Sequence, residues 1–364
     1  MNDPLACLLV ILGGMTPVGL LGCATDFAHP FRTVDAGADA GVDADANATP
    51  PDAGPDTPPI ICPTKLVGYA TLVGDGGVGT TGGGDAGTVV ATTLEELRTY
   101  LRQVGPAIVK VSGTINNPTP TSPVEVESDK TILPVRYGDG LTGAGLLINK
   151  VHNVIVRNLT IAKAVQPSDA VTIQSSNNVW VDHCDLSSDL VMPKGYYDGL
   201  VDIVHGSYNV TVSWNYLHDH YNPSLVGHTD TPTSGNTEDL ALAATFHHNW
   251  FQRTSSGAPR ARFGHVHLFS NHYSNVDSYA IASVMGAALR IEGNVFDNTV
   301  VTSIVTHIDG TPVDGTIADV GNLYSPAAAP MPTTAPNNWT PPYAYADSVD
   351  PVNVDSCAGV GKVP

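Results

Sequence analysis

The clearest pattern along the chain is a succession of short apolar runs, in which Val, Ile, Thr and aromatic residues alternate with polar ones. Asn, Ser, Gly or Asp ends each run, which is typical of β-strands closed by tight turns. One example is NVIVRNLTI, which begins at Asn153, and similar runs continue from Ala107 to Thr299. The pattern predicts an all-β domain built from many short strands.

The runs also carry a repeat, in which a polar residue precedes an apolar pair at intervals of 22 to 34 residues. The repeat positions are Asn158, Cys184, Asn215, Asn249, Asn271 and Asn294. A drifting period of this length indicates a solenoid, and neither a leucine skeleton nor a helical period of 3.6 residues accompanies it. We therefore predict a parallel β-helix in which like residues stack on like and the Asn side chains hydrogen-bond along the axis.

One segment departs from the β pattern and predicts a helix. TTLEELRTYLRQVG has an apolar stripe at Leu94, Leu97 and Leu101, with two Glu residues in the first turn. Thr92 or Thr93 can cap its N-terminus. We expect this helix to cover the exposed end of the β-helix core. The preceding GDGGVGTTGGG contains a G-x-G-x-x-G match, but the surrounding pattern favours a loop over a dinucleotide site.

The N-terminal part of the chain is distinct from this domain. Residues 1–23 are apolar and too rich in Gly and Pro for a good membrane-spanning helix, so we interpret them as an export signal. The signal ends in LLGC, which resembles a bacterial lipoprotein cleavage box, and Cys23 would then carry a lipid anchor. Residues 24–61 are rich in Asp, Ala, Gly and Pro and predict a disordered tether. The folded domain is therefore expected over 62–364, secreted or held at the cell surface.

Charge and cysteine content narrow the function further. The net charge of −19 excludes general nucleic-acid binding, which needs a basic surface.

An oxidising compartment permits a disulfide between Cys62 and Cys357, with two free thiols as the alternative. Cys184 lies within a strand-like run and is interpreted as a buried small apolar residue rather than a nucleophile.

Three aspartates form the first candidate site. Asp198 and Asp202 are four residues apart in YYDGLVD, which places them on one face of an extended segment. Asp169 lies one coil earlier. Stacked coils would bring the three carboxylates together, and such a cluster needs a hard cation, for which Ca²⁺ fits best outside the cell. The alternative is three separate, solvated loop aspartates.

Two arginines form the opposite half of this candidate site. Arg260 and Arg262 alternate, so both point to the same face of a strand, and a guanidinium fork suits carboxylates. A cleft with Ca²⁺ on one wall and Arg on the other would bind a polymer that carries carboxylates; local surface ion pairs are the alternative. His265 and His267 have the same spacing, but no zinc signature is completed, which favours stacked, hydrogen-bonded His.

A series of motifs in order carries a family resemblance: NNVWVDHCDLS, YYDGLVDIVHGSYNVTVSWNYLHDH, SLVGHTD, ATFHHNWF and APRARFGHVHLFSNHY. Together they resemble the pectate lyase family of polysaccharide lyases over about residues 62–330. The resemblance implies a right-handed parallel β-helix that cleaves polygalacturonate (pectate) by Ca²⁺-assisted β-elimination. It also implies Asp169, Asp198 and Asp202 as Ca²⁺ ligands and Arg262 as the arginine that binds the substrate carboxylate, whereas Asp182 and His183 of the WVDH segment are interpreted as structural.

The sequence departs from the family pattern at two basic positions. The family's proposed base is an Arg two residues before the Pro of the R-x-P-x-x-R motif, and that place is Gly257 here. A substrate-binding Lys is replaced by Asn222. Losing a general base lowers a rate by about 10² to 10⁴, so we expect the variant Gly257→Arg to raise activity. The chain is otherwise expected to act as a monomer on the polysaccharide.

Three explanations of these departures stay open. A neighbouring residue can substitute for the base, with Arg253, Arg260 and His228 as the candidates. The protein can be a weak or altered lyase, or a pectin-binding relative without activity. A β-helix glycoside hydrolase that uses Asp198 and Asp202 as its acid and base is a further alternative.

Overall fold

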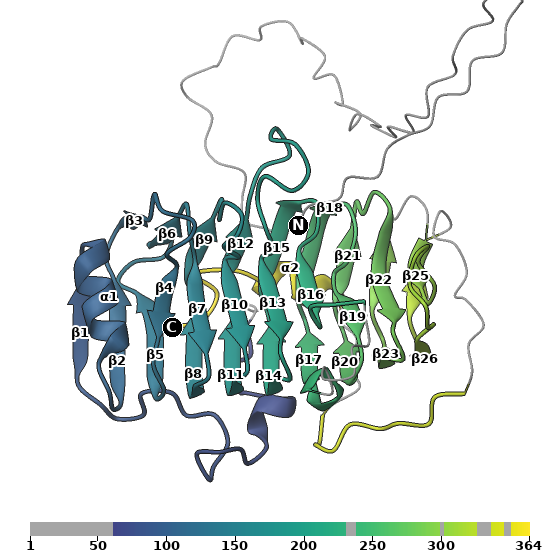
Figure 1. Ribbon diagram of the computed structural model, residues 1–364, viewed down its shortest axis with the longest axis horizontal. Helices are drawn as coiled ribbons and strands as arrows, with labels where there is room; N and C mark the ends of the chain where they lie inside the picture. Colours follow the sequence, from purple (N-terminus) through teal and green to yellow (C-terminus); the bar gives the residue numbers. More distant parts are fainter. Residues whose placement is uncertain (1–60, 231–237, 299–301, 326–335, 346–350) are drawn as a thin grey trace, which may run out of the picture. The chain divides into compact units, whose positions relative to one another are not determined.

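Neighbouring strands of the β-helix pair in parallel, and they form three sheets that run along the solenoid (Figure 1). This computed structural model describes residues 61–364 except 231–237, 299–301, 326–335 and 346–350. The predicted export signal lies outside the described residues, as does the predicted tether apart from Ile61. No helix among the described residues is long and apolar enough to span a membrane.

Each sheet collects one strand from each successive coil. The first sheet contains, in spatial order, β1 (Thr88–Ala91), β2 (Ala107–Val111), β5 (Lys130–Pro134), β8 (His152–Arg157), β11 (Asn177–Asp182), β14 (Tyr208–Ser213), β17 (Ala243–His247), β20 (His265–Phe269), β23 (Ala288–Glu292) and β26 (Thr316–Val320). The second sheet contains β4 (Val124–Val126), β7 (Leu146–Asn149), β10 (Val171–Gln174), β13 (Val201–Val204), β16 (Ser224–Val226), β19 (Arg260–Arg262), β22 (Tyr279–Val284) and β25 (Thr302–Val305). The third sheet contains β3 (Thr114–Asn116), β6 (Gly140–Thr142), β9 (Thr160–Ala162), β12 (Asp185–Ser187), β15 (Tyr216–His220), β18 (Trp250–Thr254), β21 (His272–Ser274), β24 (Val295–Asp297) and β27 (Leu323–Tyr324). The predicted all-β, parallel β-helix class is confirmed.

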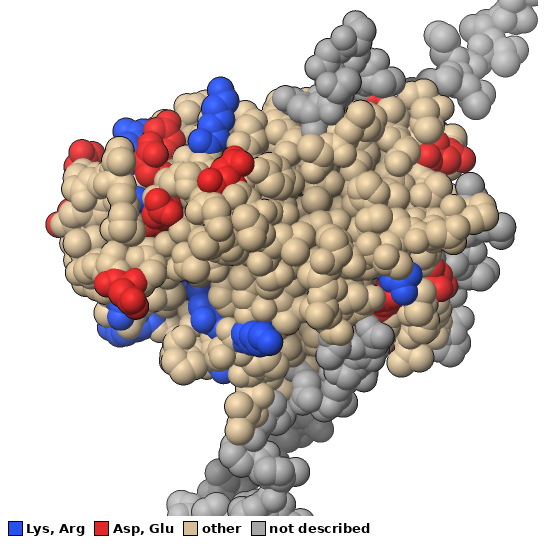
Figure 2. Space-filling view, turned by 90° about the horizontal axis from the view of Figure 1, so that it is seen from below, with Lys and Arg blue, Asp and Glu red and all other residues tan. Residues whose placement is uncertain are grey.

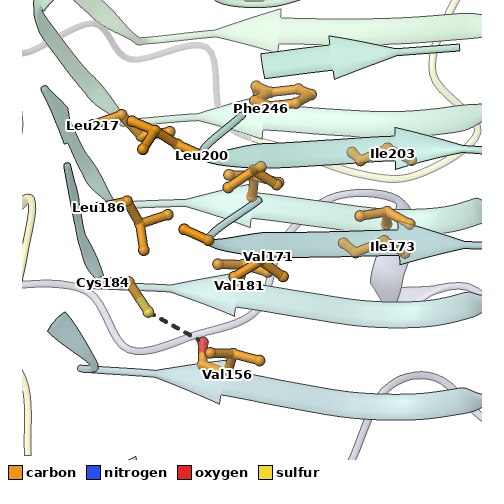
Figure 3. Packing of buried hydrophobic residues seen from close by; sticks show 14 of the residues in the cluster. Val156, Val171, Ile173, Val181, Cys184, Leu186, Leu200, Ile203, Leu217 and Phe246 are labelled. Atoms are coloured by element: carbon orange, nitrogen blue, oxygen red, sulfur yellow. Dashed lines mark hydrogen bonds between the residues drawn. The ribbon is translucent and has the colours of Figure 1, made fainter. Parts of the chain in front are cut away.

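The core consists of columns of like side chains that point into the solenoid. Alternate residues of each strand face inward, so apolar residues in register stack from one coil to the next. In the second sheet, Ile173 of β10 lies beside Ile203 of β13, and both are fully buried. Figure 3 shows this stacking for Val171, Ile173 and Ile203 together with the neighbouring sheets. The third sheet ends in an aromatic column, whose ring centroids are 4.8 to 5.0 Å apart: Phe251, Tyr273, Phe296 and Tyr324.

An asparagine ladder runs along one turn of the solenoid, as the repeat predicts. The Asn215 backbone and side-chain amides donate to Oδ1 of Asn249 at 3.0 Å, and Asn249 donates to Asn271 in the same way. The ladder continues through Asn294 to Asn322. Each of these buried hydrogen bonds is worth about 1 kcal/mol.

The prediction that Asn158 is the first position of the repeat is wrong. Thr160 pairs with Asp185, so Leu159 rather than Asn158 is the equivalent of Cys184. Asn158 has a left-handed backbone (φ 58°) and donates instead to the carbonyl of Val363. The correction follows from sheet register, which the spacing of polar residues alone did not fix.

The predicted capping helix is α1 (Leu94–Arg102), which packs against β1, β2 and β4 at one end of the solenoid (Figure 1). Thr93 is the N-cap, and its hydroxyl and the Glu96 side chain form a capping box. Leu97 and Leu101 are fully buried against the core, which closes the exposed end of the sheets.

Shorter elements and one disulfide complete the domain. These elements are the 3₁₀ turns η1 (Tyr69–Thr71) and η2 (Glu238–Ala241) and the helix α2 (Pro351–Cys357). Cys62 and Cys357 form a disulfide with their Cα atoms 5.4 Å apart, so the two ends of the described chain are joined. Cys184 is a buried free thiol, as predicted, and burial raises its pKa to about 12. On the face seen in Figure 2, Lys, Arg, Asp and Glu are sparse over the middle of the domain.

Candidate functional site

The outward face of the second sheet brings acidic and basic side chains into one column. Asp202 of β13 lies beside Leu225 of β16, and Leu225 lies beside Arg260 of β19. Since neighbouring strands are about 4.8 Å apart, Asp202 and Arg260 are separated by roughly 10 Å along this column. The column therefore carries a carboxylate and a guanidinium that lie two strands apart.

Two of the three predicted carboxylates converge on the same short segment. The Asp169 carboxylate precedes β10 and accepts hydrogen bonds from the Gly199 amide at 2.8 Å and from the Thr172 hydroxyl at 2.6 Å. A Cβ atom placed on Gly199 would lie 2.4 Å from Oδ1 of Asp202 and 3.0 Å from Oδ1 of Asp169. Gly199 therefore permits a close approach of these two buried carboxylates that a side chain would prevent.

Burial and mutual repulsion disfavour the ionised form of this cluster. Burial raises the pKa of Asp169 to about 6, and the charge of Asp198 adds to the effect. Burial also raises the pKa of Asp202, followed by the charge of Asp169. Asp198 is half-buried, and burial raises the pKa of its carboxyl as well. A cation bound here would remove much of this electrostatic penalty.

The chemistry of the donors fits a hard cation, because carboxylate oxygens are the ligands that Ca²⁺ prefers. Within the part of the chain that the structure describes, no three His, Cys, Asp or Glu side chains already form a group that would hold a metal ion. Asp169 and Asp202 approach each other, and Asp198 acts on both electrostatically. The assignment of Asp169, Asp198 and Asp202 as Ca²⁺ ligands stays a prediction.

Arg260 and Arg262 share one carboxylate partner. Both side chains lie on the outward face of β19, as their alternation predicts, and both bind Asp230. Arg260 contacts the two Asp230 oxygens through Nη2 at 2.8 and 2.9 Å, while Nε of Arg262 reaches Oδ1 at 2.5 Å. Nη1 of Arg262 donates to the Gly227 carbonyl at 2.9 Å. Although burial opposes it, the Arg262 and Arg260 charges lower the pKa of Asp230.

Arg262 also faces the acidic cluster. Only 7% of its surface is exposed, and its positive charge lowers the pKa of Asp202 against the effect of burial. The arginine pair and the aspartates therefore lie on the same face of the second sheet. Asp230 was not expected from the sequence, since it is a single aspartate at the end of SLVGHTD.

A cavity of about 140 Å³ lies at the place of the missing base. Asn222, Gly257, Arg260 and Tyr279 line it, and Lys194 from the β12–β13 connection completes its rim. The Asn222 side-chain oxygen accepts a hydrogen bond from the Ser256 hydroxyl at 2.9 Å. The two departures from the family pattern, Asn222 and Gly257, thus meet at one small cavity beside Arg260.

The other residues considered as substitutes for the base have structural partners. Arg253 lies on β18 in the third sheet and is bound to Asp219 at 2.6 and 2.7 Å. Nδ1 of His228 lies 2.8 Å from Asp239, and its ring stacks on His205 at 3.8 Å. Of the three candidates, only Arg260 lines the cavity at Gly257.

The side chains of the remaining predicted motifs make internal contacts. The Asp182 carboxylate lies 2.7 Å from Nδ1 of His183 and 2.9 Å from Nε of Arg157, and it accepts a hydrogen bond from the Ser213 hydroxyl at 2.6 Å. His267 is buried between Glu292 and Tyr343, with contacts of 3.2 and 2.7 Å. The interpretation of WVDH and of His267 as packed, hydrogen-bonded groups agrees with these contacts, whereas the side chain of His265 shows, among the described residues, only a ring contact with Trp339, with centroids 4.9 Å apart.

Comparisons with known proteins agree with this architecture. A model of the pectate lyase family matches residues 60–362. The chain is similar to a pectate trisaccharide-lyase from Bacillus licheniformis, with 36% identity over 82% of this chain and 87% of the relative. It is also similar to pectate lyase B from Colletotrichum gloeosporioides, with 43% identity over 64% of this chain and 69% of that protein.

A solved structure gives the same result for the fold. A pectate lyase from a Bacillus species, crystallised in complex with trigalacturonate, superposes with a TM-score of 0.73. The two are 29% identical, and the match covers 82% of this chain and 99% of the other. The family match covers nearly the whole described domain, and the Bacillus licheniformis relative is more than 30% identical to this chain. Together with the three parallel sheets, these findings show that the chain belongs to the pectate lyase family and is a polysaccharide lyase.

Proposed function

We propose that this protein cleaves polygalacturonate by Ca²⁺-assisted β-elimination outside the cell. The observation that carries the proposal is the single outward face on which buried Asp169 and Asp202 lie opposite Arg262. A polymer with regularly spaced carboxylates is the substrate whose charge complements both halves of this face. The relative solved with trigalacturonate supports the same substrate class.

The reaction needs a neutralised carboxylate as well as a base. The C5 proton of a uronate becomes removable only when negative charge developing on the adjacent carboxyl group is stabilised. Ca²⁺ held by Asp169, Asp198 and Asp202 would supply this Lewis-acid stabilisation when bound.

The arginines supply fixed positive charge on the same face. Arg262 is held in place by the Gly227 carbonyl, so its guanidinium needs little reorganisation during the reaction. A substrate carboxylate that binds Arg262 has to share it with Asp230 or displace Asp230 from it. Binding of the polymer therefore either adds a second carboxylate to Arg262 or exchanges Asp230 for a substrate carboxylate.

Export is part of the proposal because polygalacturonate is an extracellular polymer. It is supported by the apolar residues 1–23 and by the lipoprotein-like sequence that ends at Cys23. Labelling with a fatty-acid analogue, compared between the natural chain and the variant Cys23→Ser, tests the lipid anchor. Incorporation that does not depend on Cys23 would contradict this assignment.

The decisive experiment measures the unsaturated product. Elimination creates a C4–C5 double bond that absorbs ultraviolet light, whereas hydrolysis leaves saturated ends. We expect absorbance to rise with polygalacturonate in the presence of Ca²⁺, to stop on addition of a chelator and to return with excess Ca²⁺. Reducing ends without absorbance would favour a glycoside hydrolase, and Ca²⁺-dependent binding without any cleavage would favour a pectin-binding protein.

A further inference from the structure

The cavity beside Arg260 lies where the proposed reaction lacks a proton acceptor. Gly257 has no side chain, and the amide of Asn222 is not a base. Elimination nevertheless requires a group that removes the C5 proton. This inference rests on the proposed function and asks which residue of this chain accepts that proton.

Most polar groups around the cavity are unsuited to this role. The Asn222 side chain is bonded to Ser256. Burial raises the pKa of Tyr279, so its phenol keeps its proton. Arg260 is held by both oxygens of Asp230 and remains a cation.

Lys194 is the remaining nitrogen base on the rim of the cavity. Its side chain is exposed and makes no hydrogen bond or ion pair with the residues that the structure describes. A lysine amine has a lone pair in its neutral form and can then act as a general base toward a bound sugar. Lys194 is also only four residues before Asp198, so one connection carries both the amine and a predicted Ca²⁺ ligand.

The connection that carries Lys194 is held in a defined conformation. Oδ1 of Asp189 accepts hydrogen bonds from the Val191 and Met192 amides at 3.1 and 3.2 Å. Oδ2 of Asp189 binds Nζ of Lys163 at 3.0 Å and the Tyr197 hydroxyl at 3.0 Å. These contacts hold the connection on both sides of Lys194, through the two amides before it and the Tyr197 hydroxyl after it.

Arg260 provides the second observation that points to a ligand. Its Nε atom is buried and has no hydrogen-bond partner within the described part of the chain, although its Nη2 atom is bound to Asp230. An unpaired buried N–H costs about 1 to 3 kcal/mol. A substrate carboxylate in the cavity, which Lys194 also lines, would supply the acceptor that this N–H lacks.

We propose that Lys194 is the proton acceptor of this lyase and that Arg260 binds the carboxylate of the same uronate. The neutral Lys194 amine takes the C5 proton and becomes an ammonium. The C5–H electron pair forms the C4–C5 double bond, and the C4–O bond to the departing sugar breaks. Water protonates the departing oxygen, and the ammonium returns its proton to solvent.

The test compares Lys194→Ala with Lys65→Ala, which removes the same charge from another exposed lysine, in the full chain with Ca²⁺. Polygalacturonate cleavage is followed by ultraviolet absorbance, and kcat and KM are measured separately. We expect Lys194→Ala to lower kcat by about 10² to 10⁴ with little change in KM. Added ethylamine should restore part of the rate of Lys194→Ala and leave Lys65→Ala unchanged.

Each other outcome overturns a defined part of the inference. If kcat of Lys194→Ala stays within twofold of the natural chain, Lys194 is not the proton acceptor. A change confined to KM, or a low kcat that ethylamine does not restore, assigns Lys194 to substrate binding or loop structure instead. A natural chain that forms no unsaturated product contradicts the proposed function itself, which distinguishes that failure from an active enzyme that does not use Lys194.

Discussion

The buried carboxylate of Asp169 gives the sharpest prediction about the candidate Ca²⁺ site. Its pKa is raised from 3.8 to about 6 by burial and by the charge of Asp198. The variant Asp169→Asn replaces the carboxylate by a neutral group of the same shape. The amide oxygen can still accept the Gly199 N–H, and the Thr172 hydroxyl can turn to accept from the amide nitrogen.

The magnitude follows from the linkage between protonation and folding. A tenfold change in a protonation equilibrium is worth about 1.4 kcal/mol, so a pKa of about 6 in place of 3.8 disfavours the ionised folded state by about 3 kcal/mol. Because the folded-state pKa is the higher one, the stability contributed by protonated Asp169 is present below pH 3.8 and is lost as the pH rises through about 6. Without metal, Asp169→Asn should therefore be more stable than the natural chain at pH 8.

Urea unfolding at several pH values, with a chelator and then with Ca²⁺, measures this effect. With the chelator, we expect Asp169→Asn to gain about 3 kcal/mol at pH 8 and to lose the fall in stability between pH 4 and 7. Ca²⁺ should stabilise the natural chain but much less the variant, because a ligand that binds the folded state raises its stability. The exposed Asp85→Asn is the matched control and should behave like the natural chain in both conditions.

The reasoning is refuted if Asp169→Asn is no more stable than the natural chain at pH 8 in chelator. It is also refuted if the two proteins show the same dependence of stability on pH. Equal stabilisation of both by Ca²⁺ would leave the electrostatic argument intact but would remove Asp169 from the ligand set.

Three further predictions concern the arginine, the missing base and the disulfide. Arg262→Lys should lower kcat on polygalacturonate by at least about 10², because an ammonium cannot reproduce the planar fork that reaches the Gly227 carbonyl; an unchanged kcat would exclude a role in the reaction. Gly257→Ala should lower the free energy of unfolding by about 1 to 2 kcal/mol, since φ is +73°. Gly257→Arg has the same cost in stability, so the ratio of its kcat to that of Gly257→Ala measures what the guanidinium adds to the rate. A ratio of one or less would contradict the expected gain in activity. Replacing Cys62 and Cys357 by Ser should lower unfolding stability by about 2 to 5 kcal/mol, measured in urea under oxidising conditions, because the bridge closes a separation of 295 residues. Equal stability of the two forms would show that the bridge does not form.

The sequence by itself determined the solenoid and its cap. Alternating Val and Ile residues with a drifting repeat are compatible with few other folds, because each coil can bury its apolar side only against the next. The same reasoning predicted the ladder that includes Asn249 and the helix that buries Leu97. The exact register of the strands could not be predicted from this pattern, as Asn158 shows, because a shift by one residue hardly alters a spacing of 22 to 34 residues.

The candidate site was only partly predictable. Asp169, Asp202 and Arg262 were identified from motifs, and the tertiary structure brings them to one face of the second sheet. Asp230 and Lys194 gave no signal in the sequence, since each is an isolated charged residue in a connection of irregular length. Their positions depend on how such connections fold over the sheet, through contacts between residues about thirty apart in the chain, such as Asp230 and Arg260. Local patterns encode the strands because each strand repeats the same environment, whereas a connection between coils has no repeat, and only the folded structure decides where its side chains lie.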